Sequence, residues 1–412
     1  MFDSNTIARL RSQFPALAKQ VNGQPAVYFD GPAGTQVPER VIQAIGDYLR
    51  HCNANHGGHF ATSHESDVLL DECHQAAADF VGAASGDCIA FGANMTSLNF
   101  ALSRALARTW QPGDEIMVTR LEHDANFTPW VTAAADADVT VRYVDIHPED
   151  CTLDLEDLRS KLSDKTRLIA VGCASNAVGS KNPVQQICSW ASEVGAISVL
   201  DAVHYGPHDR IAVQTWDCDF LLCSAYKFFG PHVGIMYGRK ALLEELVPYK
   251  LRPAPNDLPG RWMTGTQNHE CIAGTKAAID YLAELAGPGD AANRPQRLDV
   301  AFDSIRQYEM NLFARLLNGL LSNSHLRVYG ITDASRMDQR LPTVAFTHDR
   351  LSSAEVAKRC GDAGIFVWHG NYYALPLTET IGVEPEGMVR VGLVHYNTTD
   401  EVDRLLAFLQ TL

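Results

Sequence analysis

Short apolar runs alternate with amphipathic stretches between residues 86 and 240, and this alternation restricts the fold more than any other feature of the chain. Helical periodicity falls between the apolar runs, as at Ser97–Arg108 and Val184–Val194. The predicted strands are Cys88–Phe91, Glu115–Thr119, Val139–Asp145, Arg167–Cys173, Ile197–Asp201, Asp219–Cys223 and Val233–Tyr237. The pattern predicts an α/β fold in which helices cover both faces of a mostly parallel seven-stranded sheet.

The chain of 412 residues is long enough for two domains. Residues 251–295 are rich in proline, glycine and asparagine, and we place a boundary near their end. This gives a large domain over residues 21–294 and a smaller α+β domain over residues 295–412. The smaller domain is expected to contain a long helix at Leu298–Leu321, a helix at Ala354–Ala363, and strands at Leu326–Tyr329, Thr343–Thr347 and Met388–Val394. Residues 1–20 are expected to pack on it.

Charge and cysteine usage exclude several classes of protein. The net charge is -15 and no lysine or arginine cluster is present, which argues against nucleic-acid and anionic-membrane partners. The N-terminus lacks the apolar core of a signal peptide, and no apolar run approaches the ~20 residues that span a bilayer. The ten cysteines are scattered without a CxxC pair. We therefore expect a cytoplasmic protein with reduced thiols.

The segment HCNANHGGH places His51, Cys52, His56 and His59 close together in sequence. Their spacing matches no closed zinc motif, and the glycine pair predicts a loop near the active site. We expect no bound metal.

Lys227 lies in the stretch CSAYKFFGP, directly after a predicted buried strand. Burying an ammonium ion is costly, so a lysine in such a setting has a lowered pKa and can serve as a nucleophile. One use of such a lysine is a Schiff base with pyridoxal 5′-phosphate (PLP). The alternative is an ordinary surface lysine in a loop.

Polar residues follow four other predicted strands, and each offers chemistry that PLP needs. Asp201 suits the pyridine nitrogen, His123 can stack on the ring, and Asn176 can donate to the 3′-oxygen. Thr96 begins a predicted helix whose amide groups can bind the phosphate, and Ser224 adds a hydroxyl beside Lys227. Each residue alone is more readily explained as structural. Together, at five strand ends that meet at one edge of the sheet, they favour a PLP site.

Several motifs in this order identify a family resemblance. The motifs are GANMTSLNFAL, EHDANFTPW, ASNAVGS, DAVHYGPH, SAYKFFGPHVGIMYGR, TGTQN and VRVGLVHYNTTDEVDRL. From about residue 26 to the C-terminus, the chain resembles the class V aminotransferase family of fold-type I PLP enzymes, and most closely its cysteine desulfurase branch. The resemblance implies a PLP-dependent lyase or transferase.

The resemblance also implies residue roles. Lys227 would carry the Schiff base, and His123 would stack on the ring as part of the catalytic machinery. The cofactor would further contact Met95, Thr96, Asn176, Asp201, His204, Ser224 and Tyr226. Arg390 would pair with the substrate carboxylate, with Ala33 and Asn176 beside it. Thr266 would reach the partner subunit's phosphate, which implies a homodimer with active sites at its interface.

Three positions depart from the desulfurase pattern. His204 stands where glutamine is usual, and Tyr226 stands where histidine precedes the lysine. The third departure is decisive for the chemistry. Desulfurases carry a cysteine on a mobile loop that accepts the substrate sulfur, and in the matching segment VWHGNYYALPL that position is Tyr373. A persulfide here, and a sulfur-acceptor protein, are therefore not expected.

What remains is Cα deprotonation followed by loss of a β-substituent, which is a C–S lyase reaction on cysteine or an S-substituted cysteine. Trp368, Asn371 and Tyr373 would border the substrate, and Tyr373 would either protonate the leaving sulfur or pack the lid. One alternative is desulfuration through a displaced thiol such as Cys360, which we expect to be a packing residue. Epimerase, aminotransferase or decarboxylating deaminase activity is another, which His204 favours. A non-catalytic PLP-binding protein would not need Lys227, Asp201 and Arg390 together.

Overall fold

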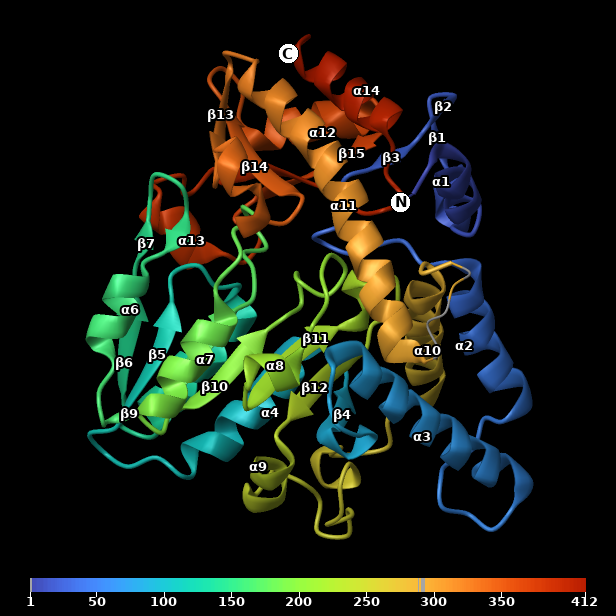
Figure 1. Ribbon diagram of the computed structural model, residues 1–412, viewed down its shortest axis with the longest axis vertical. Coiled ribbons are helices and arrows are strands. Elements are labelled where there is room, and N and C mark those ends of the chain that lie inside the picture. The colour runs from blue at the N-terminus through green and yellow to red at the C-terminus, as the bar shows by residue number, and fades with distance from the viewer. Residues whose placement is uncertain (1, 288, 290–292) are drawn as a thin grey trace.

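The computed structural model describes residues 2–287, 289 and 293–412. Its largest sheet has seven strands in the order β4-β12-β11-β10-β9-β5-β6 (Figure 1). Their bounds are β4 Ile89–Gly92, β5 Glu115–Thr119, β6 Thr140–Val144, β9 Thr166–Gly172, β10 Ile197–Asp201, β11 Phe220–Ser224 and β12 Gly234–Gly238. β12 is antiparallel to both its neighbours, and the other neighbouring pairs are parallel. The predicted mostly parallel seven-stranded sheet is confirmed.

The sheet is buried on both faces because its strands send alternate side chains into two apolar layers. In β9, Leu168 and Ala170 join one layer, while Ile169 and Val171 join the other. The first layer also contains residues of α4 (Met95–Ala107), α5 (Thr128–Asp136) and α9 (Lys240–Glu245). The second contains residues of α3 (Ala61–Val81), α7 (Val184–Glu193), α10 (His269–Glu284) and α11 (Arg294–Leu321). Burial on both faces explains why these strands read as continuous apolar runs.

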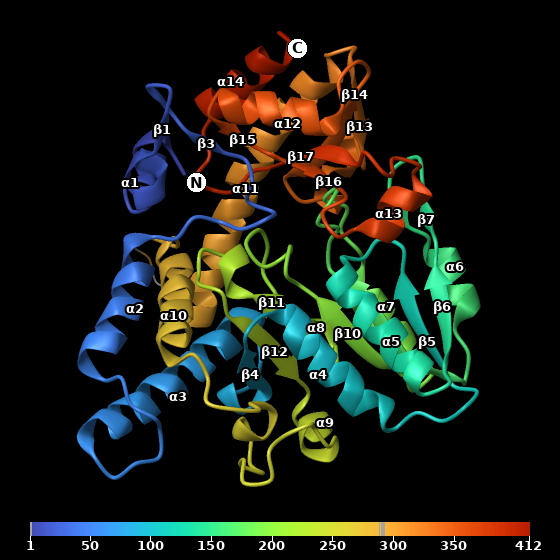
Figure 2. The ribbon, with the colours of Figure 1, turned by 180° about the vertical axis from the view of Figure 1, so that it is seen from behind.

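A second, antiparallel sheet lies above the large one in both views (Figures 1 and 2). Its order is β13-β14-β17-β16, with bounds β13 Leu326–Tyr329, β14 Thr343–His348, β16 Trp368–Gly370 and β17 Met388–Gly392. Residues of α12 (Ser353–Asp362) and α14 (Thr399–Leu409) complete its core, and α14 begins with a capping box between Thr398 and Glu401. This arrangement places β17, which carries Arg390, next to the upper edge of the large sheet.

Helix α11 connects the two parts of the molecule through 28 residues. Leu298 and Phe302 lie in the core of the large sheet, whereas Phe313 and Leu316 lie in the core of the small one. The predicted domain boundary at residues 294 and 295 falls at the first residues of this helix, and the division itself stays a prediction. Part of the glycine-rich stretch before it, residues 288 and 290–292, lies outside the described residues.

The N-terminal segment contacts both parts. Helix α1 (Ser4–Arg11) is tied to the C-terminal region because the Arg11 guanidinium lies 2.8 Å from Glu401. The Phe14 ring contacts Phe229 of the large part and Tyr396 of the C-terminal region. β3 (Val27–Tyr28) pairs in parallel with β15 (Ile365–Phe366). The segment that leads to Ala33 is thereby fixed between the two sheets.

Helix α2 (Glu39–His51) packs against α10 on the flank of the molecule. The remaining short elements are β1 Gln20–Val21, β2 Gln24–Pro25, β7 Ile146–His147, β8 Thr152–Leu153, α6 Leu155–Lys161, α8 Val213–Trp216 and α13 Leu375–Thr380. Among the helices that the structure describes, none combines the length and apolarity that a membrane crossing requires.

Candidate active site

A cavity of about 540 Å³ lies at the edge of the large sheet where the parallel strands end. Its walls come from the segments that follow β4, β5, β9, β10 and β11. The predicted residues that line it are Met95, Thr96, His123, Asn176, Asp201, His204, Ser224, Tyr226 and Lys227. The structure therefore brings together side chains that are separated by up to 132 positions in the chain.

Lys227 follows β11 through one short turn, Ala225–Lys227, which directs it into the cavity. Its Nζ atom donates to the backbone carbonyls of Pro32 and Ala33, the latter at 3.1 Å. Burial lowers the pKa of Lys227 to about 7; the Arg390 charge adds to this shift, and Asp201 opposes it. This direction of shift favours the unprotonated amine, which a nucleophilic lysine requires.

Asp201 ends β10 and is almost fully buried. One carboxylate oxygen accepts the Val203 amide at 2.8 Å. Burial raises the pKa of Asp201 to about 6, while the Val203 amide and Lys227 act in the opposite direction. A buried carboxylate whose charge is balanced only weakly by neighbouring groups is suited to pair with a protonated ring nitrogen.

His123 presents a flat, neutral ring to the same cavity. Its Nδ1 accepts the Ala125 amide at 3.0 Å, so in the neutral ring the proton resides on Nε2. Burial lowers the pKa of His123 to about 4, helped by the positive charges of Lys227 and Arg390. An uncharged imidazole can stack on an aromatic cofactor without repelling a protonated ring.

The start of α4 lies at one corner of the cavity. The Met95 amide donates to Ser224 Oγ at 2.9 Å, which leaves the hydroxyl hydrogen of Ser224 free to donate elsewhere. β12 passes so closely that a Cβ at Gly234 would lie 2.4 Å from the Asn94 backbone. Thr96 follows in the first turn. Amide groups at a helix start together with hydroxyls are the usual setting for a phosphate.

Two buried polar atoms at the cavity have no partner within the described part of the chain: Asn176 Oδ1 and His204 Nε2. Buried polar atoms are normally paired, so Asn176 and His204 carry unused hydrogen-bonding capacity at the cavity wall. A buried lysine, a buried carboxylate, a flat ring and the start of a helix surround the same space. The donor set therefore fits PLP.

A second cavity of about 620 Å³ adjoins the first and shares His123, Asn176 and Lys227 with it. Its other walls include Ala33, Trp368, Tyr372, Tyr373 and Arg390. The Arg390 guanidinium donates to the Asn176 carbonyl at 2.9 Å and lies 4.3 Å from the centre of the Tyr372 ring. It is almost fully buried beside Asp30, whose pKa burial raises to about 6. The planar donors of Arg390, which form no ion pair within the described part of the chain, suit a small carboxylate.

The loop after β16 has an unusual backbone. Tyr372 and Tyr373 both have positive φ angles, 56° and 59°, which non-glycine residues seldom adopt. The Tyr373 carbonyl accepts the Asp124 amide at 2.6 Å, and the Tyr373 ring stacks on His123 with centroids 5.6 Å apart. The Tyr373 side chain is otherwise exposed (72%). The loop thus holds a phenol at the mouth of the site.

Two predicted residues lie apart from this group. Thr266 lines a different cavity of about 570 Å³, together with His56 and His269. Asn371 is absent from the described linings of the two adjoining cavities, and its side chain accepts the Tyr373 amide at 3.1 Å. Over residues 2–287, 289 and 293–412, no three His, Cys, Asp or Glu side chains gather as metal ligands would.

Sequence reasoning missed several residues of the site. Glu122 lines the first cavity, and its carboxylate accepts Thr119 Oγ1 at 2.6 Å and the Gly172 amide at 3.0 Å. Burial raises its pKa to about 7. Its position next to His123 in the sequence was a signal for its place in the site. Asp30 was not assigned a role because it lies far from Arg390 in sequence, and Tyr372 was not because its contact depends on how the loop after β16 folds back on β17.

The aminotransferase class-V family model matches residues 27–405. The chain belongs to the class V aminotransferase family. Like other members, it is a PLP-dependent enzyme with the fold-type I architecture.

Curated relatives match this chain over almost its whole length. A cysteine desulfurase of Pectobacterium carotovorum is 32% identical, with 99% of this chain and 98% of the relative covered. The aminotransferase-like protein FGM3 of Gibberella zeae is 34% identical with the same coverage.

Solved structures agree with the sequence relatives. The apo cysteine desulfurase of Thermococcus onnurineus NA1 superimposes with a TM-score of 0.87 at 26% identity, covering 98% of this chain and 97% of that one. The cysteine desulfurase CsdA of Escherichia coli gives 0.85 at 23% identity, with 100% and 98% covered, and supports the fold alone. Cysteine desulfurase-type enzymes are thus relatives of this chain.

Proposed function

We propose that this PLP-dependent enzyme cleaves the C–S bond of cysteine or of an S-substituted cysteine by β-elimination. The observation that carries the proposal is the residue at the loop position of the desulfurase thiol. Tyr373 stands there, and none of the ten cysteines of the chain lines either cavity. Without a thiol beside the substrate there is no protein acceptor for sulfur.

Cys360 is a poor substitute for the missing thiol. It lies on α12, fully buried in the core of the small sheet. Burial raises the pKa of Cys360 to about 12, so the thiolate that would attack sulfur is scarce. Desulfuration through this residue would need the helix to leave its core.

Substrate would be held by its carboxylate on Arg390, in reach of Lys227. PLP, when bound, supplies an electron sink that stabilises negative charge at the substrate Cα. Asp201 would hold the ring nitrogen, His123 would stack on the ring, Asn176 and His204 would face the 3′-oxygen, and Met95, Thr96 and Ser224 would hold the phosphate. Tyr226 completes this wall, with its ring 5.0 Å from Lys227 Nζ.

Two side chains of this protein can accept and donate the protons that the reaction moves. Lys227 takes the Cα proton with its unprotonated amine. As the C–S bond breaks, the leaving sulfur takes the electron pair, and Tyr373 donates a proton to it from the cavity mouth. Water completes the reaction, so that one S-substituted cysteine and one water yield a thiol, pyruvate and ammonia. Trp368 and Asn371 would shape the loop around the S-substituent.

The proposal is tested with purified enzyme and four substrates: cysteine, cystine, an S-alkylcysteine and alanine. Thiol and pyruvate in equal amounts are expected from the S-alkylcysteine. Alanine formed from cysteine would instead identify a desulfurase. Exchange of the α-proton or racemisation without pyruvate would identify the epimerase alternative, and a keto acid with aminated cofactor would identify an aminotransferase. Lys227→Ala is the inactive control.

We also propose a cytoplasmic homodimer. Ten free cysteines, eight of them buried, suit a reducing compartment. Thr266 lies in a cavity apart from Lys227, so its proposed phosphate contact would have to reach the partner subunit's site.

A further inference from the structure

A fully buried histidine–glutamate pair lies behind the cofactor cavity and has no part in the chemistry above. His208 Nδ1 and Glu309 Oε2 are 2.7 Å apart, and the side chains are only 2% and 1% exposed. The two residues lie 101 positions apart, His208 after β10 and Glu309 on α11. Buried ionisable pairs are costly to assemble, so a pair kept at this place calls for a function.

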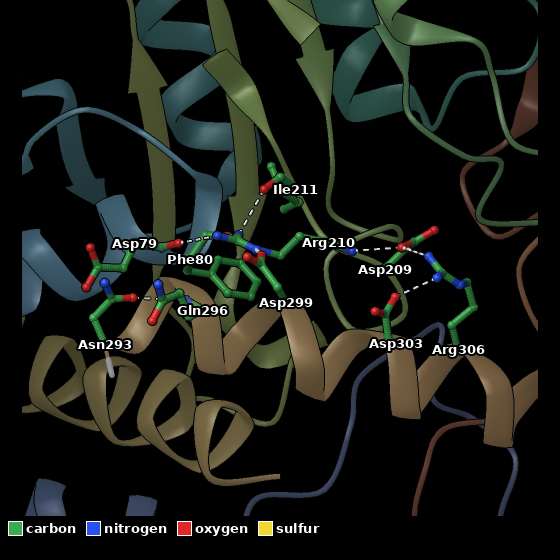
Figure 3. A network of polar contacts seen from close by, with 10 residues as sticks. All are labelled: Asp79, Phe80, Asp209, Arg210, Ile211, Asn293, Gln296, Asp299, Asp303 and Arg306. Carbon is green, nitrogen blue, oxygen red and sulfur yellow. Dashed lines mark hydrogen bonds and ion pairs between the residues drawn. The ribbon is translucent and has the colours of Figure 1, made fainter. Parts of the chain in front are cut away.

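The pair is the inner end of a clamp between α11 and residues 208–210. Asp209 is bound by Arg306 at 3.0 Å, and Arg210 is bound by Asp299 at 2.7 Å (Figure 3). Arg210 also donates to the carbonyls of Asp79 and Ile211, each at 2.9 Å. Positions 299, 306 and 309 fall on one side of an α-helix. One side of α11 therefore contacts three consecutive residues, His208, Asp209 and Arg210.

His208, at the inner end of the clamp, contacts His204, which faces the cofactor cavity. His204 lines the cofactor cavity, and its ring meets the His208 ring edge-on with centroids 5.4 Å apart. His204 Nε2 is buried with no partner in the described part of the chain. A proton on Nε2 would be an unpaired buried donor, so the neutral ring is better protonated on Nδ1.

Electrostatics agree with a neutral His204. Burial holds the pKa of His204 well below its usual range, and His208, Arg390 and Lys227 act in the same direction. Asp201 and Glu122 line the same cavity from β10 and the segment after β5. Burial lowers the pKa of His395, and His208 acts in the same direction.

We propose that Glu309, acting through His208, is a positioning residue that fixes His204 as a hydrogen-bond donor to the 3′-oxygen of PLP. Glu309 fixes the His208 ring through Nδ1, and the His208 edge then sets the orientation of His204. The proposal rests on the cofactor placement and not on the proposed C–S cleavage. Through Glu309, helix α11 would then influence the protonation of the cofactor, although α11 also belongs to the core of the small sheet.

The test is the pH titration of the visible absorbance band of PLP-loaded enzyme without substrate, so that turnover plays no part. Glu309→Gln should move the midpoint to higher pH by at least about 0.5 pH unit. A weaker donor leaves negative charge on the 3′-oxygen less stabilised, so the cofactor keeps its proton to higher pH. Asp299→Asn is the matched control, because it removes another clamp contact on the same side of α11 but does not face His204. Its midpoint should stay within about 0.1 pH unit of the parent protein.

Equal midpoints for Glu309→Gln and the parent protein, with both folded and loaded, would overturn the proposal, as would equal shifts in both variants. A second measurement, made on the parent enzyme, does not depend on whether Glu309→Gln folds. In ¹⁵N-histidine-labelled parent enzyme, the His204 signals, assigned by their loss in His204→Gln, should show protonated Nδ1 and unprotonated Nε2. A doubly protonated ring, or protonated Nε2, would reject the inference.

Discussion

The ring of Tyr373 stacks on the ring of His123, with centroids 5.6 Å apart and planes inclined by 26°. The two residues come from the loop after β16 and the segment after β5, so the contact joins the small sheet to the cofactor edge of the large one. It places a phenol beside the residue proposed to stack on PLP. The proposed acid role of Tyr373 depends on this contact.

Replacing Tyr373 with phenylalanine keeps the stacking and removes the acid. We expect kcat for an S-alkylcysteine to fall about 10²-fold, because a positioned acid contributes about that much. An S-aryl substrate with a good leaving group should lose far less, since its thiolate needs no proton. Steady-state rates with both substrates measure this difference. If the two substrates lose activity equally, Tyr373 only packs the loop.

Replacing Tyr373 with cysteine restores the thiol that the desulfurase pattern requires. This variant should form alanine from cysteine and carry cyanolysable sulfur, and the parent enzyme should do neither. Tyr373→Ser is the control, because it opens the same space without a thiol. Alanine formation by the serine variant would show that sulfur acceptance needs no cysteine at this position.

The pKa of Lys227, near 7, predicts how apoenzyme takes up PLP. Only the unprotonated amine attacks the aldehyde, so the uptake rate should fall about tenfold per pH unit below pH 7 and level off above it. Arg390→Met should move this midpoint to higher pH, since the arginine charge lowers the lysine pKa. Asp201→Asn should move it to lower pH, since Asp201 acts in the opposite direction. Stopped-flow absorbance records the rates, and a midpoint near 10 in the parent protein would contradict the described burial.

Arg390→Lys should weaken substrate binding although the charge is kept. Its planar donors suit a carboxylate, and charge-assisted hydrogen bonds are worth about 1.5–3 kcal/mol, or roughly 10–150-fold. We expect the loss mainly in KM, with spectroscopic PLP binding unchanged. A normal KM in this variant would mean that another group binds the carboxylate.

Thr266→Ala and Lys227→Ala test the shared active site together. Each homodimer should be inactive or bind PLP weakly. After mixing and subunit exchange, half the sites of a heterodimer combine Lys227 of one subunit with Thr266 of the other, so activity should return to about a quarter of the parent value in an equal mixture. No recovery despite proven exchange would place Thr266 outside the partner subunit's site.

The sheet could be predicted from sequence because strands buried on both faces are short, apolar and bounded by polar residues. Each of the seven strands was located to within one residue at either end. The cavity residues were found for the same reason: Asp201 and Lys227 directly follow such runs. Helix α10 was not predicted. Ile272, Ile279 and Leu282 have helical spacing, but the nearby proline and glycine residues indicated irregular structure instead.

Other parts of the site could not be predicted because they depend on contacts between distant segments. The Arg390 contact with Tyr372 depends on how β17 packs against the loop that follows β16, and neither local pattern sets it. Likewise, no local feature around His208 indicates that Glu309 faces it. Hydrogen bonds from Asn176 and Asp124 to the Tyr372 and Tyr373 carbonyls hold the loop backbone, so no turn-forming residue in the sequence predicts its conformation.

Helix α11 contributes apolar side chains to both cores without a break. A fragment cut at residue 295 would therefore expose Leu298, Phe302 and Ile305 to water, and the remainder would lose the wall against which α3 and α10 pack. Neither piece should refold alone into a soluble monomer, and heat or urea should melt the enzyme in a single cooperative transition.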